Sequence, residues 1–314
     1  AADERDDDAV ADPDLPHSLA DRLDQPGELV AREMGEGPDV RVGDRVVVPF
    51  VCGCGRCEWC AAGDAQVCPD QWQPGFNGPG SYAELVAIPA ADFNAVPLPE
   101  AIGFEVAASL GCRFATAYRG VVDVGAVRSG EWVAVFGCGG VGLAAVMIAA
   151  SRGAHVIGVD VNPAALALAR DAGARITFDA GSQFEGGDVA EAIRAVVRGG
   201  VDLSVDALGS PATASAAVRS LRIQGRHLQV GLLPAAAIGD RATIPMHTVI
   251  WRELRVLGSH GMAASRFPQM LAEVASGALD PGRFVTRTIG LAEVPAALAA
   301  MSDGSEPGVT IIRP

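Results

Sequence analysis

The sequence predicts an α/β protein that joins a doubly wound parallel sheet to a β-rich region stapled by a metal ion. From about residue 104 onward, Ala-rich helical segments alternate with short β-branched strands, which is typical of a parallel sheet covered by helices on both faces. Before that point, short strand-like runs flank a loop with four cysteines. At 314 residues the chain is long enough for two domains.

Two predicted strands begin the β-rich region. Residues 45–50 (RVVVPF) and 81–89 (SYAELVAIP) place β-branched residues between turn residues, as strands do. The cysteine loop lies between them. We therefore expect short strands interrupted by a metal-bound lobe at residues 52–68.

Four cysteines, Cys54, Cys57, Cys60 and Cys68, follow the spacing C-x2-C-x2-C-x7-C. Clustered thiolates repel one another, and a zinc ion relieves that repulsion while closing a tetrahedral shell of four sulfur ligands. Disulfides or unrelated free thiols are the alternatives, but no secretory signal opens the chain, so an oxidising compartment has no support. The spacing predicts a structural zinc site and leaves Cys52 as a free thiol beside it.

Regular alternation of helix and strand predicts the parallel sheet. Helical periodicity covers residues 104–110 and 112–122. Five strands are then expected at residues 132–136, 155–160, 175–179, 201–207 and 225–233. Helices are expected between them at residues 145–153, 163–173, 189–199 and 211–221. The tail, residues 265–314, contains two helices and two strands that break this rhythm, and we assign it to the first domain.

A glycine-rich loop follows the strand at 132–136 and opens a helix, which is the context that the pattern G-x-G-x-x-G requires. The loop consists of Gly137, Cys138, Gly139, Gly140, Val141 and Gly142. Its first glycine permits a tight turn, its second lets the backbone approach a pyrophosphate, and its third lets the helix pack on the strand. An ordinary tight turn is the alternative interpretation. The context favours a dinucleotide-binding Rossmann domain.

Asp160 ends the next predicted strand, 18 residues beyond Gly142. A carboxylate at this place accepts hydrogen bonds from the hydroxyls of the adenosine ribose. It also repels a 2′-phosphate, so NAD is favoured over NADP. The alternative is an acid that caps the helix beginning near Asn162 and Pro163.

Composition excludes several classes of function. The formal charge is −14 and all 24 basic residues are arginine, so the surface should repel nucleic acid and no catalytic lysine exists. Signatures of serine hydrolases and kinases are absent. No apolar stretch is long enough to span a membrane. We therefore expect a cytoplasmic protein without nucleic-acid or membrane partners.

Taken together, these motifs resemble the zinc-dependent medium-chain alcohol dehydrogenase family. The resemblance covers residues 35–314 and includes the cysteine loop, GDRV at 43–46, LGCRFATAY at 110–118, the glycine-rich loop and Asp160. It implies a GroES-like catalytic domain and a Rossmann domain that binds NAD. It also implies interconversion of an alcohol with an aldehyde or ketone, and a homodimer or homotetramer. The implied division is 1–115 and 261–314 for the catalytic domain and 116–260 for the Rossmann domain.

The resemblance also implies roles for individual residues. Cys112 matches a ligand of the catalytic zinc, although a small buried hydrophobe is the other interpretation. Thr116 matches a residue that lies against the nicotinamide. Gly231, Leu232 and residues 259–261 match backbone walls of the cofactor cleft. His260 lies in that last segment, whereas His155, His227 and His247 are expected to be structural.

The sequence departs from the family where the other catalytic zinc ligands are expected. Residues 1–34 contain no cysteine, and Pro26-Gly27-Glu28 looks like the family's Gly-His-Glu motif without its histidine. The chain is then an N-terminally shortened or altered member without catalytic zinc, or His17 or Glu28 substitutes as a ligand. Two further alternatives are zinc-independent chemistry, as in quinone or enoyl reductases, and a non-catalytic NAD-binding protein. Basic residues expected near the pyrophosphate are replaced by Ala165 and Gly308.

Overall fold

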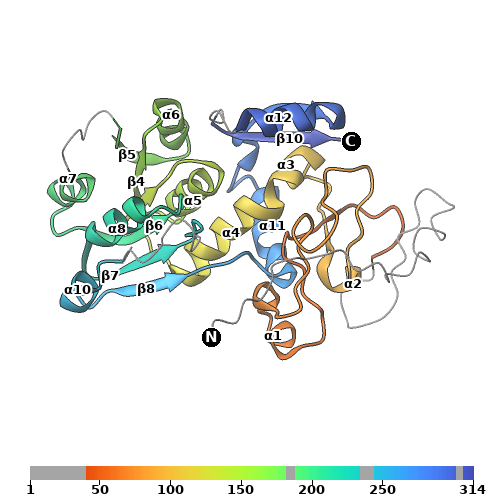
Figure 1. The fold of residues 1–314 in the computed structure, drawn as a ribbon, viewed down its shortest axis with the longest axis horizontal. Coiled ribbons are helices and arrows are strands. Elements are labelled where there is room, and N and C mark those ends of the chain that lie inside the picture. The colour runs from red at the N-terminus through yellow and green to blue at the C-terminus, as the bar shows by residue number, and fades with distance from the viewer. Residues whose placement is uncertain (1–39, 182–187, 234–243, 302–306) are drawn as a thin grey trace, which may run out of the picture.

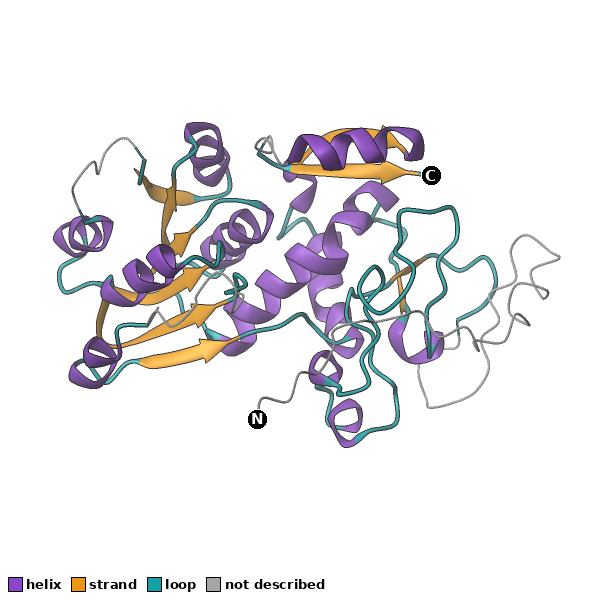
Figure 2. Cartoon of the chain, in the orientation of Figure 1, coloured by secondary structure: helices purple, strands orange, loops and turns teal. Residues whose placement is uncertain are grey.

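The structure is a computed structural model that describes residues 40–181, 188–233, 244–301 and 307–314. In Figure 1 the sheet and the helices that cover it lie on the left of the molecule, and a loop-rich region containing α1 and α2 lies on the right. A long helical segment that includes α4 crosses between them, with α11 beside it. Strands β9 and β10 and helix α12 lie together at a third position (Figure 2).

A six-stranded parallel sheet forms the larger layer, in the order β5-β4-β3-β6-β7-β8. Its strands are β3 (Trp132–Phe136), β4 (His155–Asp160), β5 (Ala174–Asp179), β6 (Val201–Asp206), β7 (Leu221–Gln229) and β8 (Arg255–Gly258). The five predicted strands are confirmed, and β8 is an addition. The chain order reverses between β3 and β6, so the carboxyl ends of these two strands flank the crevice where such sheets bind ligands.

Helices cover both faces of this sheet. They are α5 (Gly140–Ser151), α6 (Pro163–Asp171), α7 (Val189–Val196), α8 (Pro211–Arg219) and α10 (Met246–Trp251). Side chains alternate along β3, so Val133 and Val135 join the core that contains α5, while Ala134 and Phe136 join the core that contains α7 and α8. Burial on both faces explains why these strands read as continuous apolar runs.

Side chains at the helix starts fix where several of these helices begin. Asn162 caps α6 by accepting a hydrogen bond from the N–H of Ala164, and Pro163 occupies the first turn. Ser210 and Thr213 form a reciprocal capping box at α8. The helix α5 has no polar face, and eight of its residues are buried, which makes it the central helix of the core.

One helical segment connects the loop-rich region to the sheet. It runs through α3 (Phe104–Ser109), a π-helical stretch (Leu110–Phe114), α4 (Ala115–Tyr118) and a second π-helical stretch (Arg119–Val124). The two helices predicted here are therefore one. π-Helical turns are rare and frequently lie at functional sites, and the first of them contains Cys112.

The loop-rich region contains less strand than predicted. The strand β1 (Val46–Val47) pairs with β2 (Val96–Pro97), and the short helices are α1 (Glu58–Ala61) and α2 (Ala91–Asn94). The predicted strand at 81–89 is wrong, since no residue in it is in a strand and residues 81–87 are exposed. Alternation of residue types makes a strand only where a neighbouring strand and a core accept it.

The predicted tail elements are all present. They are α11 (Phe267–Ala275), β9 (Val285–Gly290), α12 (Val294–Ala300) and β10 (Val309–Arg313), with β9 and β10 parallel to each other. Phe267, Met270 and Leu271 of α11 belong to the same core as α4 and α5. Within the described ranges, no helix has the length and apolar character needed to cross a membrane.

Candidate functional site

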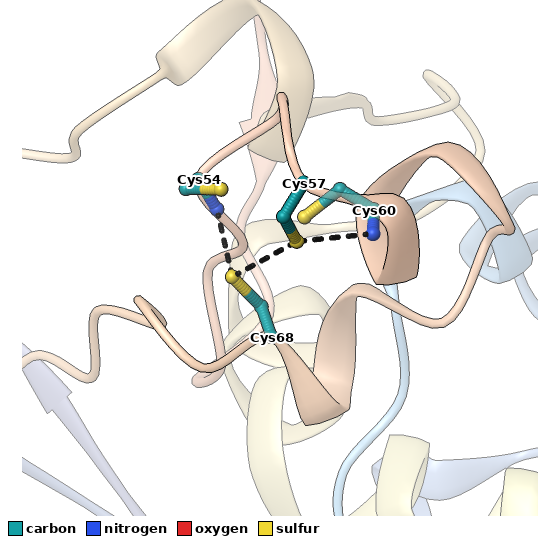
Figure 3. A group of neighbouring side chains, drawn as sticks. All are labelled: Cys54, Cys57, Cys60 and Cys68. Carbon is teal, nitrogen blue, oxygen red and sulfur yellow. Dashed lines mark hydrogen bonds between the residues drawn. The ribbon is translucent and has the colours of Figure 1, made fainter.

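The four predicted cysteines form one cluster (Figure 3). Their sulfur atoms all lie within 4.8 Å of one another. Cys57 caps the N-terminus of α1 and Cys60 lies inside this helix, while Cys68 ends a 3-10 turn at residues 65–67. The N–H of Cys54 lies 3.4 Å from the sulfur of Cys68, and the N–H of Cys60 lies 3.5 Å from that of Cys57. The loop thus gathers four sulfur atoms within reach of one ion, and two backbone N–H groups donate to two of these sulfurs.

Hydrogen bonding and burial shift the pKa values of three thiols in this cluster in opposite directions. The backbone hydrogen bond from Arg56 lowers the pKa of Cys54 to about 6. Burial raises the pKa of Cys60 to about 12 and also raises the pKa of Cys68. The raised pKa values favour the protonated thiols of Cys60 and Cys68. A bound cation would reverse this, because a coordinating thiol loses its proton outright. Four sulfur donors within reach of one ion fit structural zinc.

Cys52 lies outside this cluster, as predicted. Its buried thiol donates to the carbonyl of Pro49 at 3.4 Å, and burial raises its pKa to about 12. All seven cysteines are free of disulfides.

Of three glycines in the glycine-rich loop, the surroundings require glycine at two and leave the third open. Gly137 has φ of +87°, and a Cβ on it would meet Leu208. A Cβ on Gly142 would run into the carbonyl oxygen of Gly137, so only glycine lets α5 start this close to β3. Gly139 has open space on its Cβ side. The loop therefore leaves an accessible backbone surface at the N-terminus of a 12-residue helix, which suits a phosphate group.

Asp160 ties the end of β4 to this loop. One carboxylate oxygen accepts the N–H of Cys138 at 2.6 Å, and the other accepts the N–H of Asn162 at 2.8 Å. The structure thus shows a loop-supporting role together with a turn-capping role. A carboxylate offers about four acceptor positions, so a ribose hydroxyl can still be bound.

The loops after β6 and β7 lie at the same end of the sheet. Gly209 and Gly231 touch through their backbones, and neither has room for a Cβ. Leu208, which packs against Gly137, is 59% exposed, and Leu232 is 77% exposed. The predicted wall residues Gly231 and Leu232 are therefore placed beside the glycine-rich loop through the 208–209 turn.

Cys112 and Thr116 lie one helical turn apart in the connecting segment. Cys112 is exposed. Thr116 is buried, and its hydroxyl has no hydrogen-bond partner in the described part of the chain. Buried polar atoms without partners are rare and call for an explanation such as a ligand. Phe50 donates its N–H to the carbonyl of Gly111 at 3.0 Å, which joins the residues after β1 to this segment.

Sequence reasoning missed Arg113. Its side chain lies where a Cβ on Gly140 would be, directly against the first turn of α5. It is exposed, and no ion pair or hydrogen bond engages it among the described residues. Its position immediately after Cys112 in the matched segment is the only signal the sequence offers. It places a positive charge beside the first turn of α5.

His260 contacts the ring of Phe50 edge to face, with ring centroids 5.6 Å apart. Burial and the nearby charge of Arg119 lower the pKa of His260. Arg119 itself donates to the hydroxyl of Ser259 at 3.2 Å. These contacts bring the 259–261 segment against both the connecting segment and the residues after β1.

The described ranges contain one group of three or more potential metal ligands, the four cysteines. Cys112 belongs to no such group there, whereas a catalytic zinc takes three protein ligands. His17, Glu28 and residues 26–28, which were considered as alternatives, lie outside the described residues. The described residues therefore account for one zinc site.

Two family models match the chain. Residues 26–100 match the alcohol dehydrogenase GroES-like domain, and residues 140–276 match the zinc-binding dehydrogenase domain. The first match contains the cysteine cluster, and the second begins inside the glycine-rich loop and covers most of the sheet.

Two alcohol dehydrogenases of Geobacillus stearothermophilus are similar to the chain. One is 34% identical over 235 residues, which are 74% of this chain and 66% of the relative. The other is 30% identical over 289 residues, which are 91% of this chain and 80% of the relative. The chain thus spans just under two thirds of the first relative and four fifths of the second.

Solved structures agree with these relatives. An NAD-dependent alcohol dehydrogenase superposes with a TM-score of 0.77 at 30% identity, covering 88% of this chain and 77% of that one. The alcohol dehydrogenase TADH from Thermus sp. ATN1 superposes with a TM-score of 0.78 at 30% identity, covering 90% and 82%. The predicted fold, a GroES-like domain with a Rossmann sheet, is confirmed. The chain belongs to the zinc-type medium-chain alcohol dehydrogenase family.

Proposed function

We propose that the protein is an NAD-dependent oxidoreductase that transfers a hydride between an alcohol and the nicotinamide. The observation that carries this proposal is the glycine-rich loop, which opens α5 at the point where the strand order reverses and is tied to Asp160. Membership of an alcohol dehydrogenase family favours this function over quinone reduction and over NAD binding without catalysis.

For the cofactor, we propose contacts from three parts of the chain. The pyrophosphate would lie on Gly139, Gly140 and Val141 at the N-terminus of α5, with Gly137 and Gly142 shaping the turn. Asp160 would bind the adenosine ribose and disfavour a 2′-phosphate. Thr116, Gly231 and Leu232 would border the nicotinamide. The unpartnered hydroxyl of Thr116 supports its place in this set.

For the metal, we propose a structural zinc ion held by Cys54, Cys57, Cys60 and Cys68. This ion would stabilise the 52–68 lobe and take no part in hydride transfer. We also propose Cys112 as a residue of the reacting centre, because it is exposed and lies one helical turn before Thr116. The zinc content of the purified protein decides whether Cys112 binds a second ion.

The test combines activity with zinc content. NADH formation is followed by absorbance with NAD and a series of primary and secondary alcohols, and zinc is counted per chain. We expect alcohol-dependent NADH formation. Cys112→Ser should abolish it, with loss of one zinc only if a second ion is bound there. Binding of NADH without turnover of any alcohol or aldehyde would instead support a non-catalytic binding protein, and quinone-dependent oxidation of NADH would support a quinone reductase.

We propose further that the protein is a cytoplasmic homodimer or homotetramer. Strand β8 pairs with β7 alone within the described ranges, so one edge of it is open to a second copy. Exposed apolar side chains lie on β7, β8 and the adjacent helix α10, namely Ile223, Ile250, Trp251 and Val256.

For the domains, we propose that residues 1–115 and 261–314 form the catalytic domain and that residues 116–260 form the Rossmann domain. This division places one boundary inside the connecting helical segment.

A further inference from the structure

A stripe of polar side chains crosses two inner strands of the sheet. Ser204 and Asp206 of β6 stand directly opposite His227 and Gln229 of β7 in the parallel register. Ser204, Asp206 and His227 are fully buried. Inner strands of a parallel sheet are normally apolar on both faces. Four polar side chains together at this place therefore need a reason.

The four side chains form one continuous chain of hydrogen bonds. The hydroxyl of Ser204 lies 3.0 Å from Nδ1 of His227, and Nε2 of His227 lies 3.1 Å from Oε1 of Gln229. Nε2 of Gln229 lies 2.9 Å from the carboxylate of Asp206 and 2.8 Å from the carbonyl of Gly231. Every link is short enough to be a hydrogen bond.

Chemistry fixes the direction of this chain. The carboxylate of Asp206 and the carbonyl of Gly231 only accept, so the amide nitrogen of Gln229 must face them and its oxygen must face His227. His227 therefore donates from Nε2, and its Nδ1 accepts from Ser204. The protons run one way, from Ser204 through His227 and Gln229 to Asp206. Burial lowers the pKa of His227, which agrees with a neutral ring.

Asp206, at the end of this chain, holds the two loops beside the glycine-rich loop. Its carboxylate accepts the N–H groups of Leu208 and Gly209, both at 3.0 Å. Its backbone carbonyl accepts the N–H groups of Val230 and Gly231, at 3.1 and 2.8 Å. The last residue of β6 thus fixes the turn after β6 and the start of the loop after β7.

The 206–209 turn and the 230–232 loop pack tightly against each other and against the glycine-rich loop. Gly209 and Gly231 touch through their backbones, and Leu208 packs against Gly137 of the glycine-rich loop. A shift of the 206–209 turn would therefore move both Gly137 and the wall formed by Gly231 and Leu232. Close-packed segments have low compressibility, so a displacement of one segment displaces its neighbours.

We propose that Ser204, His227, Gln229 and Asp206 form a positioning network that sets the geometry of the cofactor cleft from behind. None of the four needs to touch the cofactor. The network acts through the 206–209 turn and the 230–232 loop. The inference rests on the proposed binding of NAD at this cleft, but the direction of the hydrogen bonds is a property of the chain itself and can be measured without any cofactor.

The first test substitutes Gln229→Glu in the full chain. Glutamate keeps the shape and the acceptor toward His227 but places a second carboxylate oxygen against Asp206 and against the carbonyl of Gly231. We expect the KM for NAD and the Kd for NADH to rise about tenfold, the loss expected for a broken buried hydrogen bond to a charged group. The KM for the alcohol should stay within about twofold, because general destabilisation lowers the active fraction and kcat but leaves KM unchanged.

Gln224→Glu is the matched control. Gln224 lies on the same strand, is exposed, and donates to the carboxylate of Glu253 at 3.1 Å, so the chemical change is the same but remote from the cleft. It should leave the Kd for NADH unchanged. Equal effects of the two substitutions, or an unchanged Kd in Gln229→Glu, would overturn the proposal.

The second test determines which atoms donate and which accept in this hydrogen-bond network, in protein without cofactor. ¹⁵N NMR distinguishes the two neutral tautomers of histidine, and loss of one signal in His227→Asn assigns the ring. In the parent protein His227 should carry its proton on Nε2. In Ser204→Ala the donor to Nδ1 is removed while Asp206 and the carbonyl of Gly231 still orient the Gln229 amide, so the proton of His227 should stay on Nε2. A proton on Nδ1 of His227 in the parent protein or in Ser204→Ala would contradict the network even where NADH binding fails for other reasons.

Discussion

At the scale of single residues, Gly139 and Gly142 separate the demands of cofactor binding from those of the fold. Gly139 has φ of −76° and open space on its Cβ side, so alanine fits the backbone. Gly142 has no such room. The two positions belong to one motif, yet only the second is required for the chain to fold.

Gly139→Ala should therefore weaken NADH binding without affecting stability. A methyl group there would stand between the loop and the pyrophosphate, so we expect the Kd for NADH to rise at least about tenfold, while the free energy of unfolding changes by less than about 0.5 kcal/mol. Fluorescence titration and denaturant unfolding measure the two quantities. Gly103→Ala, another open position with φ of −69°, is the control and should change neither. An unchanged Kd in Gly139→Ala would place the cofactor elsewhere.

Glu273 gives a prediction for pH. It accepts hydrogen bonds from Tyr118 at 2.6 Å and from both terminal nitrogens of Arg152 at 2.8 Å, linking α11 to α4 and to the end of α5. Burial alone would raise the pKa of Glu273, but the hydrogen bonds from Arg152 and Tyr118 outweigh it and lower the pKa below 4.5. Its stabilising contribution is therefore complete above that value and is lost as the pH falls through the native pKa.

Glu273→Gln should cost about 2 kcal/mol of unfolding free energy at neutral pH, as expected for hydrogen bonds to a charged group. The difference from the parent protein should shrink as the pH falls through the lowered native pKa of Glu273, because the native carboxylate then becomes protonated as well. Denaturant unfolding at a series of pH values measures it. A difference that is constant with pH would show that the charge of Glu273 contributes nothing.

At the scale of elements, the cysteine lobe is a unit whose stability depends on a metal. Cys60→Ser should lower the zinc content by one ion per chain and the free energy of unfolding by a few kcal/mol, because zinc binds the folded lobe and stabilises it by mass action. Cys52→Ser is the matched control, since Cys52 is buried nearby but outside the cluster. Elemental analysis and thermal unfolding distinguish the two. Equal zinc content in both variants would contradict the site.

The elements of the sheet could be predicted from the sequence more fully than those of the loop-rich region. Strands β3 and β4 are continuous apolar runs because helices bury both of their faces. Burial on both faces requires apolar residues at successive positions, so the sequence itself reveals it. Residues 81–89 have a strand-like pattern but lack the core that would make it one. Long-range pairing decides such cases, and one sequence does not encode it locally.

The candidate site divides in the same way. The cysteine spacing and the glycine-rich loop are local motifs, so their residues could be predicted directly. Arg113 reaches the loop only through the fold, and Ser204 and His227 meet only through the register of two parallel strands. Each of these residues is ordinary in its own segment, and their function depends on contacts between segments.

At the scale of the whole molecule, the open edge of β8 and the apolar side chains around it predict self-association. Trp251 is 77% exposed on α10, next to this edge. Trp251→Arg should place a charge in the interface and shift the protein toward a smaller species in size-exclusion chromatography with light scattering. Leu298→Arg on α12, where Leu298 is 48% exposed, is the control and should leave the mass unchanged. A monomeric parent protein would contradict the prediction.

The transfer of hydrogen itself tests the central claim most directly. The protein is incubated with NAD and an alcohol that carries deuterium on the carbon bearing the hydroxyl group, and the reduced cofactor is weighed by mass spectrometry. If the protein is an NAD-dependent alcohol dehydrogenase, the deuterium appears on the nicotinamide of the reduced cofactor, one atom for each alcohol oxidised. Binding of NAD with no deuterium transferred from any alcohol of the series would contradict the account.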